Sequence, residues 1–374
     1  MHFLLPFLLF LLQLPSAFPA RTFPQPSILN FNDTTTSSVV AAAFNSSSTP
    51  WGNFAKFANL EKGSHVTGIC DLKTYLNRFG YLPAPAPGNF SDDFDSDLES
   101  AILTYQKNLG LPPTGKLDTE TIDLIMAPRC GLGDSHLRHN TTTITHLHET
   151  RRYAYFNGRP RWTHNSPMTL TYAFSPDHMI DYISPEEIKA VFSRAFTRWS
   201  EVIPVNFTEA QNYRTADVRI GFHSGDHGDG EPFDGELGVL AHAFSPENGR
   251  LHLDSAETWA VDFGRERSNV AIDLESVATH EIGHVLGLAH SSVSDAIMYP
   301  SLRPRSRKVD LRVDDVEGIQ ALYGSNPNFN YGSLLESDRE TSNSGAGGGY
   351  RKGFGFSTWW LWTIVLSLAQ LIYF

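Results

Sequence analysis

The segment HEIGHVLGLAHSSVSDAIMYP, residues 280–300, constrains this chain more than any other stretch. Positions four residues apart lie on one face of an α-helix, so His280 and His284 are expected to point the same way. Gly287 permits the positive φ of a turn that could return His290 toward this pair. Three imidazoles can bind one zinc ion and leave its fourth position open, which is the arrangement of a catalytic zinc site.

Glu281 directly follows the first of these histidines, and Met298 lies downstream in AIMYP. Histidines packed in an ordinary core are the alternative explanation. However, the pattern H-E-x-x-H-x-x-G-x-x-H followed by a methionine turn is a metzincin signature. Ser291, immediately after the third histidine, matches the matrixin form of that signature. Residues 64–325 resemble a matrix metalloproteinase of the plant type.

The resemblance implies a zinc endopeptidase with Glu281 as its general base. Zinc lowers the pKa of a bound water toward about 7 and polarises the scissile carbonyl. Proton transfer by the glutamate is worth roughly 10²–10⁴-fold in rate. Met298 would form an apolar floor beneath the histidines, and residues 241–244 would pair with the substrate backbone as an edge strand. Ser276 would leave the pocket for the P1′ side chain deep.

The resemblance and the order of sequence patterns predict an α/β (α+β) catalytic domain of the zincin or metzincin type. This domain would have a twisted mixed sheet and three helices. Ser184 and Glu187 form a capping box at the start of one helix. Alternating apolar residues predict strands, and a spacing of three or four predicts helices. The strands are expected at 168–174, 217–223, 238–245 and 251–254, and the helices at 184–202, 273–286 and 313–323.

A small helical unit is predicted before this domain, within residues 64–130. Apolar residues spaced three or four apart predict two helices, and Asp118 is the expected cap of a third. These helices resemble peptidoglycan-binding modules. The inward-facing residues are expected to be Ile69, Leu72, Leu76 and Phe79, then Leu98, Ile102 and Tyr105.

The chain divides by composition into five segments. An apolar run with small residues at its end predicts a signal peptide, although a buried helix is the alternative. A stretch rich in Ser, Thr, Asn and Pro, residues 21–60, is expected to be a loose leader. The segments are a signal peptide (1–20), a propeptide (21–154), a catalytic domain (155–325), a linker (326–345) and a C-terminal signal (346–374).

The C-terminal segment has small residues, a short polar spacer and an apolar tail that runs to the last residue. This order is typical of a signal for a glycosylphosphatidylinositol (GPI) anchor, with Ser344 or Gly345 as the attachment site. A transmembrane helix is the alternative, because residues 357–374 have about the minimum spanning length. No basic residues follow the tail, which favours the lipid anchor at the outer face of the plasma membrane.

Secretion is also favoured by N-x-S/T sequons, which are candidate glycosylation sites. They begin at Asn32, Asn45, Asn89, Asn140 and Asn206. The formal net charge of −12 argues against nucleic acid as a partner, since phosphate binding needs a basic face. The expected partners are instead protein or peptide substrates, an activating protease and the membrane, and the protein is expected to be a monomer.

A second metal cluster is expected between residues 227 and 252. Three imidazoles and a carboxylate form a closed tetrahedral set for structural zinc. Their order and spacing resemble the structural zinc site of matrixins, whereas scattered surface histidines are the alternative. The four ligands would be His227, Asp229, His242 and His252.

The same segment carries acidic residues that suit calcium, which prefers oxygen ligands. By resemblance, the ligands would be Asp234, Asp254 and Glu257, with backbone carbonyls of Gly235, Leu237 and Val239. A solvated acidic loop is the alternative. A second calcium site is doubtful, because Arg250 stands where many animal relatives have a ligand, although Asp217 matches its other carboxylate.

Cys130 lies in PRCGLGD, which resembles the cysteine switch of matrixin propeptides. A thiolate is a good zinc ligand, so Cys130 would displace the catalytic water and keep the enzyme latent. Gly133 replaces the proline that is usual in this motif. The alternative is a disulfide between Cys70 and Cys130, which would remove the switch.

The sequence therefore predicts a secreted, anchored zinc endopeptidase that is made as a latent zymogen. The main alternative is a wall-binding protein with a catalytically inactive metal domain, against which the intact Glu281 argues. Hydrolysis of a non-peptide wall polymer is a third possibility. The expected cofactors are two zinc ions and at least one calcium ion.

Overall fold

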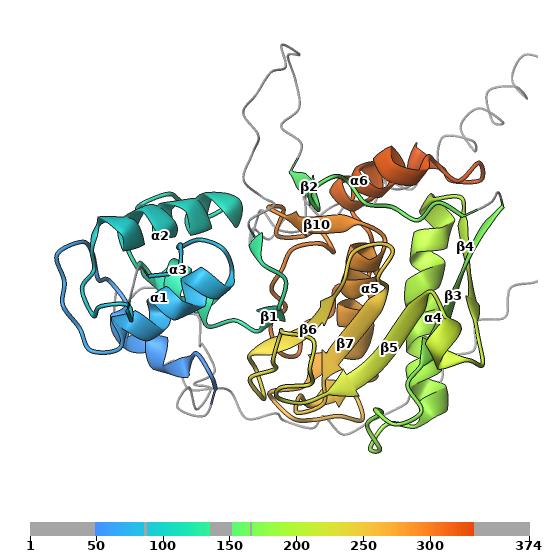
Figure 1. The fold of residues 1–374 in the computed structure, drawn as a ribbon, viewed down its shortest axis with the longest axis horizontal. Coiled ribbons are helices and arrows are strands. Elements are labelled where there is room, and N and C mark those ends of the chain that lie inside the picture. The colour runs from blue at the N-terminus through green and yellow to red at the C-terminus, as the bar shows by residue number, and fades with distance from the viewer. Residues whose placement is uncertain (1–48, 86–87, 135–151, 165–166, 333–374) are drawn as a thin grey trace, which may run out of the picture. The chain divides into compact units, whose positions relative to one another are not determined.

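The computed structural model describes residues 49–85, 88–134, 152–164 and 167–332 (Figure 1). Internal contacts divide the chain into two units, Met1–Phe44 and Asn45–Phe374, and every described residue belongs to the second. Among these residues, no helix is both long and apolar enough to cross a membrane. The expected signal peptide, C-terminal signal and most of the linker lie outside the described residues, as do Asn32, Asn45, Asn140, Ser344 and Gly345.

The predicted helical unit is present. Its inward-facing residues are all buried, which confirms the predicted helix faces. The predicted cap Asp118 accepts a hydrogen bond from Thr121 N at 2.9 Å. Residues 21–60 were expected to be a loose leader, and this is wrong for their C-terminal part. Phe54 and Phe57 lie in a short 3₁₀ helix and are buried. The elements are η2 (Gly52–Phe57), α1 (Ile69–Arg78), α2 (Ser96–Asn108) and α3 (Thr119–Ile125).

A six-stranded mixed sheet forms the centre of the following domain. β6 and β7 pair antiparallel, and the other neighbouring pairs are parallel. The predicted strands are present, and β4 is an additional edge strand. The order across the sheet is β1 (Arg129–Cys130), β6 (Val239–Ala243), β7 (Arg250–Asp254), β5 (Val218–His223), β3 (Met168–Phe174) and β4 (Val205–Glu209).

The three expected helices of this domain are α4 (Pro185–Val202), α5 (Leu274–Val285) and α6 (Val313–Tyr323). Ser184 caps α4 by accepting a hydrogen bond from Glu187 N at 3.3 Å, as predicted. α4 and α5 pack against each other and against the sheet (Figure 1). Trp199 joins these two helices, because its buried Nε1 donates to Thr279 O at 2.9 Å.

Two short ribbons were not predicted. β2 (Tyr153–Tyr155) pairs antiparallel with β10 (Leu288–Ser291), and β8 (Trp259–Ala260) pairs with β9 (Ile272–Asp273). The first ribbon positions the site, because β10 follows the turn at Gly287. There φ is +107°, and a Cβ would lie 2.3 Å from Pro160 O. A side chain at this position would therefore be strained in its backbone and would also clash.

Candidate active site and metal centres

A helix and a turn bring three histidines together. α5 presents His280 and His284 one turn apart, and β10 brings back His290 after the turn at Gly287. Cys130 lies opposite them in β1. One potential ligand atom from each of these four buried side chains lies within 4.8 Å of the other three. The structure thus brings together every residue expected at the first zinc site.

The hydrogen bonds of the first two histidines fix where their protons lie. His280 Nδ1 is 2.7 Å from Ile297 O, and His284 Nδ1 is 2.7 Å from Leu288 O. A carbonyl oxygen can only accept, so each Nδ1 carries the proton and each Nε2 presents a lone pair. These two Nε2 atoms are only 3.0 Å apart. Two facing lone pairs repel each other unless a cation lies between them.

The donor set fits zinc. Burial lowers the pKa of His280 well below its usual value, so the imidazole stays neutral and able to bind a metal. Zinc prefers nitrogen and sulfur ligands in a tetrahedral arrangement. Three imidazoles and one thiol supply this set. Carbonyl partners on the outer nitrogens are also typical of zinc-binding histidines, because they orient the rings.

Cys130 faces the histidines and is not in a disulfide. Its Sγ is 3.4 Å from His284 Nε2, and both Cys130 and Cys70 are free thiols. The structure therefore does not contain the alternative disulfide. Burial raises the pKa of the Cys130 thiol, but a metal ion at this position would favour the thiolate.

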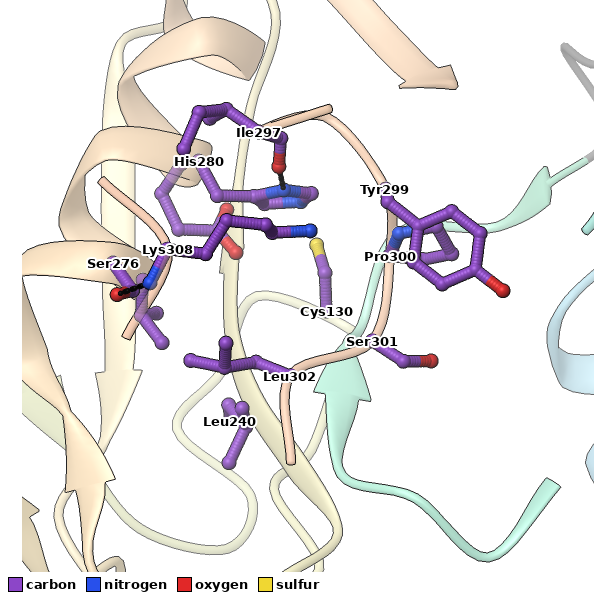
Figure 2. Close-up of a pocket in the computed structure, with 12 residues that line it drawn as sticks. Cys130, Leu240, Ser276, His280, Ile297, Tyr299, Pro300, Ser301, Leu302 and Lys308 are labelled. Atoms are coloured by element: carbon purple, nitrogen blue, oxygen red, sulfur yellow. Dashed lines mark hydrogen bonds between the residues drawn. The ribbon is translucent and has the colours of Figure 1, made fainter. Parts of the chain in front are cut away.

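The segment around Cys130 lies in the groove as an added strand. It pairs in parallel with β6, where Arg129 N donates to Gly238 O at 3.1 Å and Gly131 N donates to Ala241 O at 2.8 Å. On its other side, Cys130 N donates to Pro300 O at 2.9 Å. Figure 2 shows Cys130 between the His280 side and the 299–302 segment. Without this segment, β6 would be an edge strand of the sheet, as predicted.

Asp134 connects this segment to the third histidine. Its carboxylate accepts from Arg129 Nη2 at 2.7 and 2.8 Å, from Tyr81 OH at 2.7 Å and from His290 Nδ1 at 2.7 Å. Burial alone would raise the pKa of Asp134, but the Arg129 guanidinium and His290 lower it to about 2. The carboxylate therefore stays ionised and holds the proton of His290 on Nδ1.

Glu281 is fully buried beside the histidines. Neither of its carboxylate oxygens meets a nitrogen or oxygen donor among the described residues, and the Cys130 thiol is its polar neighbour. Burial raises its pKa to about 8, and the neighbouring Cys130 thiol lowers it in part. A buried carboxylate without such a donor is costly, so this group is suited to receive a proton or a water molecule.

The second cluster assembles as predicted. One atom of each of its four residues lies within 4.8 Å of the others. Asp229 Oδ2 is 2.9 Å from His227 Nε2 and 2.8 Å from both His242 Nε2 and His252 Nδ1. His227 Nδ1 lies 3.0 Å from the Gly225 carbonyl, so its Nε2 presents a lone pair to a carboxylate. A neutral imidazole and a carboxylate at this distance repel each other, and a zinc ion between them would remove the repulsion.

Three acidic side chains converge near this cluster. Burial raises the pKa of Asp254 to about 6, and burial together with the charge of Asp254 raises that of Glu257 to about 9. Burial also raises the pKa of Asp234. Glu257 Oε2 has no hydrogen-bond partner among the described residues. The buried carboxylates of Asp254 and Glu257 fit a hard cation such as calcium, whereas Asp234 is half-buried and lies 3.7 Å from Arg78 Nη1.

The loop between these carboxylates supplies three backbone amides. Gly235 N donates to Asp254 at 3.2 Å, Leu237 N to Glu257 at 2.8 Å and Val239 N to Asp234 at 2.7 Å. These bonds fold the loop around the acidic groups.

The residues of the doubtful second calcium site have other partners. Asp217 Oδ2 accepts from Thr171 N and Oγ1, both at 2.7 Å. Arg250 Nε donates to Asn248 Oδ1 at 2.9 Å. A guanidinium cannot bind a cation, so the structure gives no support to this site.

Met298 forms part of the core beneath the histidines. It is buried, and a Cβ on Gly283 would lie 2.3 Å from its sulfur. Asp315 holds the turn, because its carboxylate accepts from Ile297 N at 2.8 Å and Met298 N at 3.0 Å. The sequence did not single out Asp315, although an acidic residue in the first turn of α6 is a recognisable signal.

A cavity lies between α5 and the 297–302 segment, where the P1′ pocket was expected. It is not deep: its volume is about 20 Å³, close to the space of one water molecule. Ser276 is small, as noted, but Lys308 lies across the cavity (Figure 2). The sequence did not predict this because Lys308 follows a loop without periodicity.

Of the candidate glycosylation sites, two lie within the described residues. Asn89 and Asn206 are both exposed. Exposure is compatible with modification at each.

Residues 161–324 match the family model described as Matrixin, and residues 65–125 match a putative peptidoglycan binding domain. The chain is 53% identical to Metalloendoproteinase 1-MMP of Arabidopsis thaliana over 338 residues, which cover 90% of this chain and 89% of that protein. It is 58% identical to Metalloendoproteinase 4-MMP of the same plant, over 73% of this chain and 78% of the relative. The chain is 46% identical to Metalloendoproteinase 1 of Glycine max, over 73% of this chain and 87% of that protein.

Proposed function

This chain belongs to the matrixin family of zinc metalloendopeptidases, and we propose that it is a latent protease of extracellular or cell-surface proteins with Glu281 as its general base. The main support is the pair of facing Nε2 lone pairs on His280 and His284 beside the fully buried carboxylate of Glu281. We also propose the division into signal peptide, propeptide, catalytic domain, linker and C-terminal signal given by the sequence.

The catalytic zinc would be held by His280, His284 and His290. When bound, this metal polarises the scissile carbonyl and makes an attacking water acidic. Glu281 follows the first of these histidines in the chain, where it would accept a proton from the attacking water and pass it to the leaving amine. Burial raises the pKa of Glu281, whereas the charge of a bound zinc ion would lower it and keep the carboxylate ionised.

The substrate would bind where residues 129–131 now lie. Residues 128–131 form backbone hydrogen bonds with residues 238 and 241 on one side and with residues 300 and 302 on the other. An extended substrate chain would therefore find backbone partners along both walls of the groove. Recognition through main-chain bonds explains how one groove could accept many sequences, while side-chain pockets provide selectivity.

Latency would rest on Cys130 as the fourth zinc ligand. Thiol binding there excludes the water that attacks the substrate. The Arg129–Asp134 ion pair is fully buried and fixes the ends of the same segment. An activating protease would act by removing the propeptide, after which this segment no longer fills the groove.

We propose a structural zinc at His227, Asp229, His242 and His252. A calcium ion would be bound by the carboxylates of Asp234, Asp254 and Glu257 together with backbone carbonyls of residues 235, 237 and 239. The convergence of buried acidic groups supports the calcium proposal.

The wall-binding alternative has one observation in its favour, the match of residues 65–125 to a peptidoglycan-binding model. In this chain, however, the same helices precede the strand that fills the active-site groove. That position supports a propeptide role.

Replacement of the proposed base tests the function. Glu281→Ala should lower the kcat for peptide cleavage by roughly 10²–10⁴-fold, because proton transfer is lost. Zinc content measured by mass spectrometry should stay at the wild-type value, since Glu281 is not a ligand. Glu201→Ala, which removes an exposed carboxylate from α4, is the matched control and should retain activity. Undiminished turnover by Glu281→Ala would exclude it as the base.

Replacement of the switch cysteine tests latency. Cys130→Ser should cleave peptides without activation, whereas Cys70→Ser should stay latent because its thiol lies outside the cluster. Asp134→Asn should also activate more readily than the wild type, because it leaves the buried Arg129 without its ionic partner at a cost of about 3–5 kcal/mol. A latent Cys130→Ser protein would contradict this mechanism.

Metal analysis tests the cofactor assignments. The purified protein should contain two zinc ions and one calcium ion per chain. His252→Ala should lose one zinc, and Asp254→Asn should lose the calcium; each should lower Tm by more than about 5 °C, since bound metal stabilises the fold. His164→Ala, a partly exposed histidine outside both clusters, is the control. Full metal content in either ligand variant would refute that ligand set.

We propose a GPI anchor near Ser344 or Gly345 at the outer face of the plasma membrane. The support is the order of small residues, polar spacer and apolar tail in the sequence. Phosphatidylinositol-specific phospholipase should release the protein from membranes, and the mature chain should lack residues 357–374. Retention on the membrane together with an intact tail peptide would indicate a transmembrane segment instead.

A further inference from the structure

A second cleft shares no lining residue with either histidine cluster. It lies between the end of α4, the edge strand β4, the start of α6 and the 326–330 segment. Its volume is about 790 Å³, which is within the usual range for a site that binds a small-molecule ligand. The protease function proposed above gives this cleft no role.

The 326–330 segment is held beside this cleft by the end of α4. Asn326 N donates to Val202 O at 3.0 Å, and Asn326 Nδ2 donates to Ser200 O at 2.8 Å. Both carbonyls belong to the last turn of α4, where no helical amide remains to bond them. Asn326 therefore caps the helix, and its own Oδ1 accepts from Asn328 N at 2.9 Å. The wall of the cleft is thus built by specific bonds.

The lining of the cleft suits an uncharged ligand that carries hydroxyl groups. Its buried part is apolar and consists of Val202, Leu311 and Val316. Amide side chains, which both donate and accept hydrogen bonds, line the same cleft together with one aromatic ring. These residues are Asn206, Asn326, Asn328, Asn330 and Phe329. Sugar rings have the matching surfaces, because their edges carry hydroxyl groups and their faces carry apolar C–H groups.

The charged groups of the cleft argue against an anionic ligand. They are Arg198, Glu201 and Asp310, so carboxylates outnumber the single guanidinium. The guanidinium is also paired with the buried Glu275, whose Oε1 lies 2.6 Å from Arg198 Nη1. A phosphate or an acidic peptide would therefore meet net negative charge, whereas an uncharged sugar would not.

Asn206 lines this cleft and is also the first residue of the sequon Asn206-Phe207-Thr208. It lies in β4, and successive side chains of a strand point to opposite faces. Val205 is buried and Asn206 is exposed, so the amide that a glycan would modify lies on the outer side of the strand and borders the cleft. A sugar attached to Asn206 Nδ2 therefore starts within the cleft.

We propose that the glycan carried by Asn206 is docked in this cleft, with its first sugar rings against Phe329 and the amides of the 326–330 segment. The inference rests on the proposed secretion, because sequons are modified in secreted proteins. In the attachment step, Asn206 Nδ2 bonds to the anomeric carbon of an oligosaccharide carried on a lipid diphosphate. The bond from that carbon to the phosphate oxygen breaks, the diphosphate keeps the electron pair, and the amide nitrogen loses one proton.

A docked glycan would also shield β4. Figure 1 shows β4 at the outer edge of the sheet, and within the described residues it pairs with β3 alone. The unpaired backbone groups of an edge strand invite pairing with another chain, and proteins commonly cover such edges. A glycan that reaches from β4 to the 326–330 segment covers this edge and holds the segment in place.

The experiment measures how fast peptide N-glycosidase releases each glycan from the full-length protein, which is secreted from mammalian cells and kept folded. Occupancy and release are read by mass spectrometry of the peptides. The references are the glycan on the exposed Asn89 and the Asn206 glycan after denaturation. In the folded protein the Asn206 glycan should be released about tenfold more slowly than either reference, since a docked glycan is cleaved only in the fraction of time that it is undocked.

Two variants alter the cleft and leave the sequon intact. Phe329→Ala and Asn328→Ala should keep Asn206 modified and speed the release of its glycan about two- to tenfold, as expected for one lost contact. Asn328 is exposed, so its variant tests the inference if Phe329→Ala does not fold. Asn269→Ala is the matched control, because Asn269 is an exposed asparagine that does not line the cleft, and its release rates should equal those of the wild type.

A further pair of variants tests whether the glycan supports the wall of the cleft. Thr208→Val removes the sequon and leaves Asn206 in place, whereas Thr208→Ser keeps the N-x-S pattern and is the matched control. Thr208→Val should lower Tm by about 2–4 °C relative to Thr208→Ser. It should also speed amide hydrogen exchange in residues 326–332, because the segment loses its docked partner.

Three results would overturn the inference. The first is equal release of the Asn206 and Asn89 glycans from the folded protein, and the second is unchanged release in both cleft variants. The third is an unmodified Asn206 in a protein whose other sequons carry glycans, which would leave the proposed secretion intact. If no sequon were modified, the secretion would be contradicted together with this inference, while the protease function is tested separately by peptide cleavage.

Discussion

The position of the protons on the histidines determines what this molecule can bind. His280 and His284 each donate from Nδ1 to a backbone carbonyl, and these carbonyls belong to the turn and ribbon that follow α5. The fold thus fixes the rings and leaves two lone pairs 3.0 Å apart, which is unfavourable without a metal ion. Folding of this region and metal binding are therefore coupled, because the protein geometry is complete only when a cation compensates those lone pairs.

The sequence predicted both histidine clusters because metal ligands must occur as particular residue types at particular spacings. It also predicted α4, α5 and α6 from caps and apolar spacing, which are local signals. β2 and β10 were missed, since each is a short strand defined by its distant partner. Lys308 was missed for a related reason: its position depends on a hydrogen bond to Ser276, 32 residues away, which no periodicity records.

The propeptide segment uses the same physical features that would bind a substrate. It adds a strand to β6 and bonds to the opposite wall, so it satisfies backbone groups that would otherwise face solvent. Its parallel pairing with β6 places a thiol, rather than a peptide carbonyl, beside the histidines. With Cys130 as the proposed fourth ligand, an inhibitor of this kind would compete for the groove and for the metal at the same time.

Asp134 makes these two contacts interdependent. Its carboxylate bonds both to Arg129, which lies next to the switch cysteine, and to His290, which is a proposed ligand. All three groups are buried. If residues near Cys130 moved out while Asp134 stayed in place, a charge would be left unpaired in the interior. Partial release is therefore unfavourable, and the ion pair, the thiol and the added strand should leave the groove together. Latency in this architecture would be a property of the whole 129–134 segment, and the proposed zinc–sulfur bond would be one of several contacts that maintain it.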